Sequence, residues 1–145
     1  MEGLTIREMV FEEYETVIEL WKTCGLPYRP QGRDHPDRIR KEMREKQNSF
    51  LVAETEGKVI GSLLTTHDGR KGWINRLAVY QEYRNRGVAR ALVDEAEKWL
   101  LEQGIEIFAC FIEGDNKASM RVFEKLGYVK FEDISYYTKR IRPDI

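Results

Sequence analysis

The feature that most constrains the fold is the junction between a strand-like run and the longest amphipathic helix of the chain. Residues 73–79 are rich in large apolar side chains, which is typical of a strand. After residue 87 the apolar period becomes helical, and one stripe is formed by Val88, Leu92, Ala96 and Trp99. A strand that runs into a long helix in this way indicates a mixed α/β domain built around one sheet.

The region before this junction predicts three strands and two helices. Apolar residues at helical spacing begin at Tyr14, and that helix stops at the Gly-Leu-Pro of residues 25–27. A loop with two prolines leads into a second helix, which has Ile39 and Met43 on one face. The expected strands are residues 4–9, 49–54 and 58–66, with a Glu-Gly hairpin turn between the last two.

The region after the junction predicts one buried strand, one helix and two closing strands. Residues 105–112 are nearly all apolar, which is typical of a central strand covered on both faces. The last helix ends at Gly127 and has on one side Ser119, Val122, Phe123 and Leu126. Residues 128–131 and 135–140 are expected to be the closing strands. The predicted fold class is therefore α/β, with a single mixed sheet of about seven strands flanked by about four helices.

The length of the chain fits one domain, covering residues 1–145. No internal repeat, low-complexity tract or linker interrupts it. A chain of this size buries roughly 68 to 70% of its unfolded surface, so it needs neither disulfides nor a structural metal. Cys24 and Cys110 are too few for a secreted disulfide scaffold, and the two histidines have no metal-ligand spacing, so no metal is expected.

The charge balance excludes several classes of partner. Lys and Arg total 24 against 25 Asp and Glu, which argues against a nucleic-acid partner. No stretch approaches the ~18 apolar residues of a membrane span, and the N-terminus is not signal-like, so a cytoplasmic protein without a membrane partner is expected. Residues 29–46 carry seven basic and four acidic side chains. This excess is either a solvated helix face or a mouth for an anionic ligand.

The turn before the long helix has the features of a phosphate-binding site. The first N–H groups of a helix have no intrahelical partner and carry a partial positive charge, so they suit an anionic group such as pyrophosphate. Gly87 and Ala89 leave room for close approach, and full charges are added by Arg84, Arg86 and Arg90. The glycine patterns of dinucleotide-binding folds and of phosphate loops of nucleotide triphosphatases are both absent.

Two motifs resemble those of the GCN5-related N-acetyltransferases, the GNAT family. Arg84-x-x-Gly87-x-Ala89 matches the (Gln/Arg)-x-x-Gly-x-(Gly/Ala) signature of that family. Leu-Ala-Val precedes it at residues 77–79, as in the family, and residues 116–128 resemble its second motif, which begins with Asn and ends in Lys-x-Gly-Phe/Tyr. The spacing of the two motifs and the order of elements also match, so the resemblance covers nearly the whole chain.

The resemblance implies an acetyl-CoA-dependent transfer to a primary amine by direct attack in a ternary complex. It implies that acetyl-CoA is a co-substrate held by two groups of residues. The N–H groups of the turn would hold the pyrophosphate, at Arg84, Asn85, Arg86, Gly87, Val88, Ala89 and Arg90. The pantetheine arm would pair with the backbone of a splayed strand end and contact the last helix, at Leu77, Ala78, Val79, Asn116, Ser119 and Phe123. Arg121 and Arg90 are either contacts for the adenosine-side phosphates or solvated charges.

The catalytic residues are harder to transfer from the family. Many members have a Tyr as the acid for the CoA thiolate seven residues after the Asn, and that position is Phe123, which cannot donate a proton. Tyr128 is interpreted as a core residue, and the acid stays unassigned. Glu113, at the end of the strand before Asn116, is the first candidate for the general base. The further candidates for the general base are Asp68, Glu82 and His67. Cys110 is interpreted as a core residue and not as a nucleophile.

The resemblance implies that the acceptor is a small-molecule or peptide amine: a small molecule, an amino acid or a protein N-terminus. Its selection is expected to come from residues 26–43, from the hairpin tip at 67–71, and from Tyr136 or Tyr137, which cannot both point inward on a strand. One alternative function is a sensor module that binds acetyl-CoA or CoA without transfer, and another is an enzyme for longer acyl groups. The oligomeric state stays open, although a symmetric homodimer is common in that family.

Overall fold

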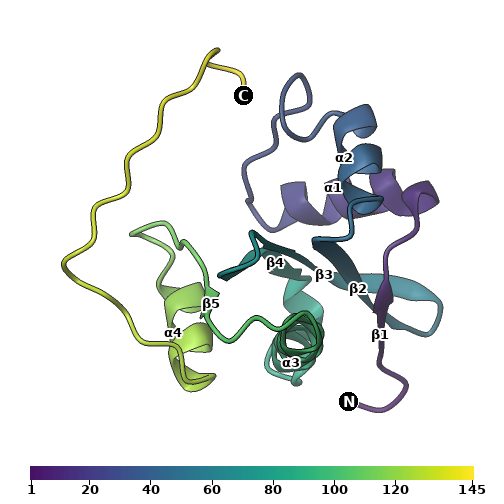
Figure 1. Ribbon diagram of the computed structural model, residues 1–145. Helices are drawn as coiled ribbons and strands as arrows, with labels where there is room; N and C mark the ends of the chain where they lie inside the picture. Colours follow the sequence, from purple (N-terminus) through teal and green to yellow (C-terminus); the bar gives the residue numbers. More distant parts are fainter.

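The computed structural model describes residues 1–145 and has one five-stranded sheet with helices on both faces (Figure 1). The strands are β1 (Thr5–Glu8), β2 (Asn48–Thr55), β3 (Lys58–His67), β4 (Gly72–Val79) and β5 (Phe108–Ala109). The helices are α1 (Tyr14–Thr23), α2 (Pro36–Met43), α3 (Val88–Glu102) and α4 (Lys117–Lys125), with short 3-10 turns at η1 (Phe11–Glu13) and η2 (Gln81–Tyr83). The four helices agree with the sequence prediction. None of them is long and apolar enough to cross a membrane.

The sheet has the strand order β1-β2-β3-β4-β5. Its first four strands form an antiparallel meander, and β5 lies parallel to β4. The long helix α3 supplies the crossover between the two parallel strands, as a parallel pair requires. The sheet is therefore mixed, as predicted.

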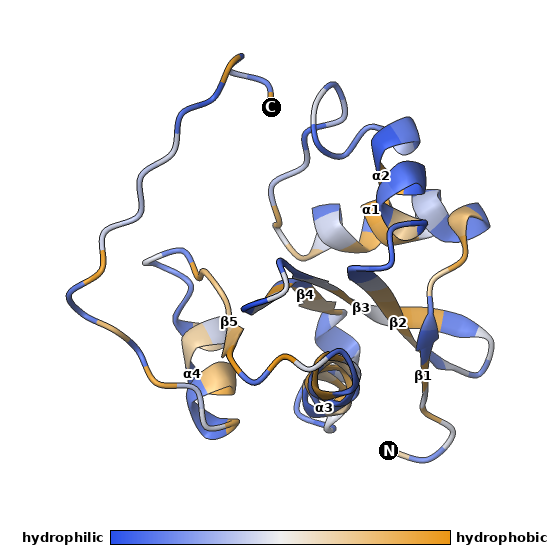
Figure 2. Ribbon diagram, viewed as in Figure 1, coloured by the Kyte–Doolittle hydropathy of each residue, from blue (hydrophilic) through white to orange (hydrophobic).

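The core has two layers because side chains alternate between the faces of each strand. Along β2, Phe50 and Val52 face α1 and α2, whereas Leu51 and Ala53 face α3. Trp21, 2% exposed, anchors α1 in the first layer. Figure 2 shows the same division, because the hydrophobic residues of α3 lie on its sheet side and its outer side is hydrophilic.

The prediction of about seven strands is wrong, because the two closing strands at 128–131 and 135–140 do not form. After α4 the chain is extended and runs along the outside of the molecule (Figure 1). Strands form only when their backbone groups find partners, and residues 129–141 make no backbone hydrogen bond with the rest of the chain. Their strand-like composition is therefore not satisfied within one chain.

The prediction of a central buried strand at residues 105–112 is also wrong. β5 covers only two residues and lies at the edge of the sheet. Ile105 is buried, but Ile107 and Phe111 are 54% and 56% exposed. The missing closing strands explain why β5 lies at the edge and why Ile107 and Phe111 are exposed, because these strands would have covered this edge.

A β-bulge in the middle of β4 shapes the side of the sheet next to β5. Ser62 of β3 pairs with Ala78 and Leu64 pairs with Asn75, so two residues of β4 stand opposite one residue of β3. One of the two, Arg76, has a φ of 56°, which is rare for a residue with a side chain. The Oγ of Ser62 holds the bulge, because it donates to the Arg76 carbonyl oxygen at 3.1 Å. A bulge bends its strand, and this one lies where β4 leaves β5.

Candidate active site

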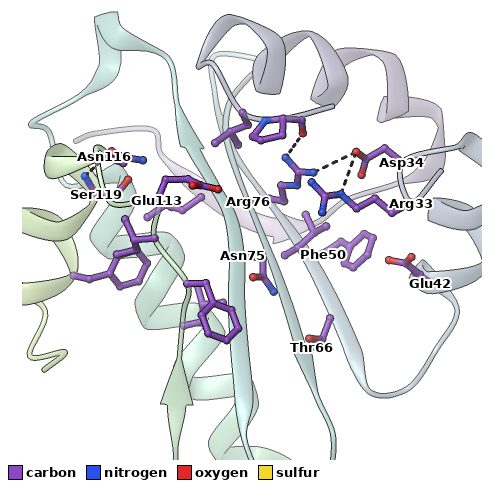
Figure 3. Close-up of a pocket in the computed structure, with 18 of the residues that line it drawn as sticks. Arg33, Asp34, Glu42, Phe50, Thr66, Asn75, Arg76, Glu113, Asn116 and Ser119 are labelled. Atoms are coloured by element: carbon purple, nitrogen blue, oxygen red, sulfur yellow. Dashed lines mark hydrogen bonds and ion pairs between the residues drawn. The ribbon is translucent and has the colours of Figure 1, made fainter. Parts of the chain in front are cut away.

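A cleft of about 380 Å³ opens between the second half of β4 and the segment that follows β5 (Figure 3). One wall comes from the loop after α1 and from α2, and the opposite wall from residues 111–116 and α4. The polar and charged residues that line it are Arg33, Asp34, Glu42, Thr66, Asn75, Arg76, Glu113, Asn116 and Ser119. The cleft thus joins the two regions that the sequence assigned to the cofactor and to the acceptor.

The edge of β4 is open along the cleft. β4 pairs with β5 only at Gly72 and Trp73, although it continues to Val79. The predicted splay between the two strands is therefore present. Backbone groups of residues 74–79 on that side have no strand partner, so an extended ligand with its own amides can satisfy them. Leu77 lines the cleft, whereas Ala78 and Val79 are 4% and 7% exposed and can offer only their backbone.

The turn at the start of α3 leaves a set of N–H groups without acceptors. Arg84 N donates to Gln81 O and Ala91 N to Gly87 O, but the N–H groups of residues 85–90 have no backbone or side-chain acceptor. Gly87 is the N-cap with a φ of 85°, and nothing lies within 4 Å of a Cβ built there. The turn therefore has the free donors and the open space that a pyrophosphate needs.

Three arginines surround this turn. Arg84, Arg86 and Arg90 are all exposed. Arg84 is the one that is held in place, because its Nε donates to Val79 O at 2.9 Å. The turn follows the end of β4 and is not part of the cleft lining itself, so the two regions would contact different parts of one long ligand.

The second motif contributes the opposite wall. Asn116 is the N-cap of α4, and its side chain accepts a hydrogen bond from Ser119 N at 3.1 Å. Asn116, Ser119 and Phe123 all line the cleft. Phe123 is 5% exposed and contacts the Tyr128 ring edge-on, with 5.1 Å between the ring centroids. The motif therefore presents two polar side chains and one aromatic ring to the ligand.

Tyr128 is partly buried and packs against the core layer on the α3 side of the sheet. Its hydroxyl donates to Glu97 Oε2 at 2.7 Å, and it does not line the cleft. Burial, followed by the hydrogen bond to Glu97, raises the pKa of Tyr128 above its usual value. The cleft lining contains no Tyr, Cys or His, so the proton donor that the family takes from a tyrosine has no counterpart on these walls. Cys110 is half-buried, and burial raises the pKa of its thiol to about 11.

The candidate bases differ in where they lie. Glu113 lines the cleft at an exposed position, on the side of Asn116 (Figure 3). Asp68, Glu82 and His67 do not line it. The Asp68 carboxylate accepts from the N–H groups of Arg70 and Lys71 at 2.8 Å, which lowers its pKa and makes it a turn-stabilising group. Of the four carboxylate and histidine candidates, Glu113 alone reaches the cleft.

Glu42 is a cleft residue that the sequence reasoning included in the acceptor segment 26–43 but did not single out. It is half-buried and has no ion-pair partner. Burial is the main cause that raises the pKa of its carboxyl group, and the charge of Asp34 adds to it. A signal was present in the sequence, because Glu42 follows Ile39 by three residues and so shares its face of α2.

A buried ion pair attaches the acceptor-side loop to β4. Asp34 is 3% exposed, and its Oδ2 accepts from Arg76 Nη2 at 3.2 Å and from Arg29 N at 2.8 Å. The other end of the Arg76 guanidinium donates to Pro27 O, and its centre lies 4.8 Å from the Trp21 ring. Figure 3 shows the contact between Arg76 and Asp34. The bulge residue therefore positions the wall of the cleft.

Only one of the predicted acceptor segments lines the cleft over several residues. Residues 26–43 line the cleft through Leu26, Pro27, Arg33, Asp34, Ile39 and Glu42. The hairpin tip at 67–71 does not reach it, and Tyr136 lies instead on Phe111, with ring centroids 4.5 Å apart. Of the basic side chains in residues 29–46, Arg33 alone lines the cleft, so most of that run is a solvated face.

Comparison with known proteins identifies the family. Residues 9–128 match the acetyltransferase (GNAT) family. The chain is 35% identical over 141 residues to the acetyltransferase SG1711 of Sodalis glossinidius, a match that covers 97% of this chain and 98% of that protein. The chain therefore belongs to the acetyltransferase (GNAT) family, as its motifs predicted, and uses acetyl-CoA.

Solved structures confirm the fold. An aminoglycoside antibiotic 6'-N-acetyltransferase from Acinetobacter baumannii superposes with a TM-score of 0.80 at 21% identity, covering 97% of this chain and 100% of that one. The PaiA N-acetyltransferase from Thermoplasma acidophilum, in complex with coenzyme A, superposes with a TM-score of 0.79 at 22% identity, covering 91% of this chain and 92% of that one. Both likenesses concern the architecture of the chain.

Proposed function

We propose that this acetyltransferase moves the acetyl group of acetyl-CoA directly to a primary amine of a small cationic acceptor while both substrates are bound. The observation that carries the proposal is the composition of the cleft. The open edge of β4 lies next to the free N–H groups of the α3 turn, and both walls of the cleft carry carboxylates, Glu42 on the α2 wall and Glu113 on the opposite wall. Asp34 is paired with Arg76, but Glu42 and Glu113 have no cationic partner. Two free carboxylates favour an acceptor that carries positive charge.

Acetyl-CoA would lie along β4 with its pyrophosphate on the α3 turn. The N–H groups at 85–90 supply the donors, and the charges of Arg84, Arg86 and Arg90 add to them. The pantetheine arm would pair with the backbone of residues 77–79 and contact the side chains of Asn116, Ser119 and Phe123. A backbone N–H of the same strand is the candidate donor to the tetrahedral oxyanion.

Glu113 is the group that we assign as proton acceptor. Alkylamines are mostly protonated at pH 7, so the acceptor ammonium must lose a proton before its nitrogen can attack. The nitrogen lone pair then forms a bond with the thioester carbon, the C–S bond breaks and CoA leaves as a thiolate, and the nitrogen releases a second proton to water to give the neutral amide. Phe123 cannot protonate that thiolate, and a thiol pKa near ~8.5 allows it to leave without an acid.

Calorimetric titration with CoA tests the cofactor half of this proposal. Gly87→Trp fills the space where the pyrophosphate would lie, and we expect CoA affinity to fall by about 100-fold or more. Gly69→Trp is the matched control, because Gly69 is also exposed, has a φ of 87°, and has nothing within 4 Å of its Cβ position. Wild-type affinity in Gly87→Trp would show that CoA binds elsewhere.

A further inference from the structure

The bulge residue of β4 is held in an uncommon backbone conformation. Arg76 has a φ of 56°, and it is not a glycine, for which this conformation would be easy. The other two residues with a side chain and a positive φ, Glu56 and Asn85, lie in exposed turns, whereas Arg76 lies inside a strand with its side chain 12% exposed. A residue in such a conformation persists only where its surroundings impose it, and such residues cluster at functional sites.

Two consecutive buried hydrogen bonds hold the carbonyl group of Arg76. Trp21 of α1 donates through Nε1 to Ser62 Oγ at 3.0 Å, and Ser62 Oγ donates to Arg76 O at 3.1 Å. The direction of both bonds is fixed, because an indole N–H can only donate and a carbonyl oxygen can only accept. Trp21 and Ser62 are 2% and 0% exposed, so water does not compete for either bond.

Trp21 also holds the side chain of the same residue. The centre of the Arg76 guanidinium lies 4.8 Å from the Trp21 ring, within the range of a cation–π contact. One indole therefore fixes the bulge residue twice, by its N–H through Ser62 and by its ring. Thr65 of the same strand is a contrast, because its hydroxyl is also buried but has no hydrogen-bond partner.

The position of the Arg76 carbonyl sets the direction of the next N–H group. The chain has no cis peptide bond, and in a planar trans peptide the C=O of one residue and the N–H of the next point in opposite directions. Ser62 holds the Arg76 carbonyl on the β3 side, so Leu77 N–H points away from β3, toward the edge of β4 that has no strand partner. Leu77 lines the cleft at that edge.

We propose that Ser62 and Trp21 are positioning residues for acetyl transfer, because they hold Leu77 N–H toward the carbonyl oxygen of the acetyl thioester. When the amine nitrogen bonds to the thioester carbon, the C=O π electrons move onto that oxygen, and an N–H already aimed at it stabilises the new charge. Without the two hydrogen bonds, Arg76 can relax toward a negative φ, which turns the Arg76–Leu77 peptide and its N–H away. This inference rests on the proposed position of acetyl-CoA along β4 and not on the nature of the acceptor.

Calorimetric titration with CoA and with acetyl-CoA separates this role from a general effect on the fold. Ser62→Ala removes the link to Arg76, and Trp21→Phe removes the indole N–H but keeps a ring beside the guanidinium. We expect both variants to bind CoA like the wild type. Acetyl-CoA affinity should fall about two- to tenfold in Ser62→Ala, and by less in Trp21→Phe, because the Ser62 hydroxyl remains but is no longer oriented. Thr65→Val is the matched control and should change neither affinity, because it removes a buried hydroxyl of β3 that has no partner.

Infrared spectra of bound acetyl-CoA, labelled with ¹³C at the acetyl carbonyl, test the hydrogen bond itself. A donor to the thioester oxygen weakens the C=O bond and lowers its stretching frequency. The band should therefore lie at higher frequency in Ser62→Ala and Trp21→Phe than in the wild type, and at the wild-type frequency in Thr65→Val.

These measurements need no acceptor, so an error in the proposed acceptor class would not affect them. Circular dichroism establishes that each variant is folded, and Trp21→Phe serves if Ser62→Ala is not. Equal losses of CoA and acetyl-CoA affinity, or a carbonyl band that neither variant moves, would overturn the positioning role. CoA binding that survives Gly87→Trp would instead refute the proposed cofactor site.

Discussion

The ion pair between Asp34 and Arg76 should be a large contributor to the stability of the cleft. Asp34→Ala leaves the Arg76 guanidinium, whose side chain is 12% exposed, without its counter-charge. Removing one partner of a buried pair costs about 3–5 kcal/mol. Arg33 is the other cation near Asp34, at 3.8 Å and 41% exposed, and pairs of that kind contribute ~1 kcal/mol or less.

The two residues should also be strongly coupled. Arg76→Met leaves Asp34 its hydrogen bond from Arg29 N, so this change should cost about 1–3 kcal/mol. The double variant removes both charges and should be more stable than Asp34→Ala alone, because no buried charge is left unpaired. The expected fall in Tm for Asp34→Ala is roughly 10 °C for a chain of this size.

Thermal and urea unfolding of the wild type, Asp34→Ala, Arg76→Met and the double variant measures the coupling between the two residues. Asp37→Ala is the control, because the Asp37 side chain is 88% exposed and its loss should cost less than about 1 kcal/mol. Steady-state kinetics on the same variants should show a raised KM for the acceptor and an unchanged CoA affinity. A loss below about 1 kcal/mol in Asp34→Ala, or additive losses in the double variant, would refute the reasoning.

Three further predictions concern the carboxylates and Phe123. Because burial raises the pKa of Glu42, ionisation of its carboxyl group in the folded state lowers stability at high pH. Glu42→Gln should therefore raise Tm at pH 8 and not at pH 4, and it should raise the KM for a cationic acceptor. Equal Tm shifts at both pH values would contradict this explanation. Glu113→Gln should lower kcat and leave CoA affinity unchanged, and an unchanged kcat would exclude Glu113 as the base. Phe123→Tyr should raise turnover or leave it unchanged, since it restores an acid, whereas a large loss would mean that Phe123 packs against the acyl arm.

Local signals in the sequence predicted most of the fold. The helical stripes of α1 and α3 and the glycine turn before α3 depend on neighbouring residues, and the structure has all of them. The splay of β4 from β5 is also present, but it was expected only from the resemblance to the family. Residues 128–131, 135–140 and 105–112 were misjudged because their composition is that of paired strands, whereas the structure has no strand after α4 and only a two-residue strand at β5.

The candidate site was predictable on the cofactor side and less so on the acceptor side. Asn116 and Glu113 were found because they lie next to a motif. The pairing of Asp34 with Arg76 joins residues 42 positions apart and depends on a bulge with positive φ, which no local pattern shows. Glu42 was hidden in a run of basic residues, although its spacing from Ile39 placed it on the inner face of α2.

Mass spectrometry of transfer products tests the central claim most directly. The purified protein is mixed with acetyl-CoA and a pooled panel of polyamines, aminoglycosides, amino acids and short peptides. The account predicts that a cationic small-molecule amine gains one acetyl group, and that Gly87→Trp abolishes the product while Gly69→Trp does not. If acetyl-CoA binds the wild type but no amine in the panel is acetylated, or if neutral acceptors are preferred, the proposed transfer to a cationic amine is contradicted.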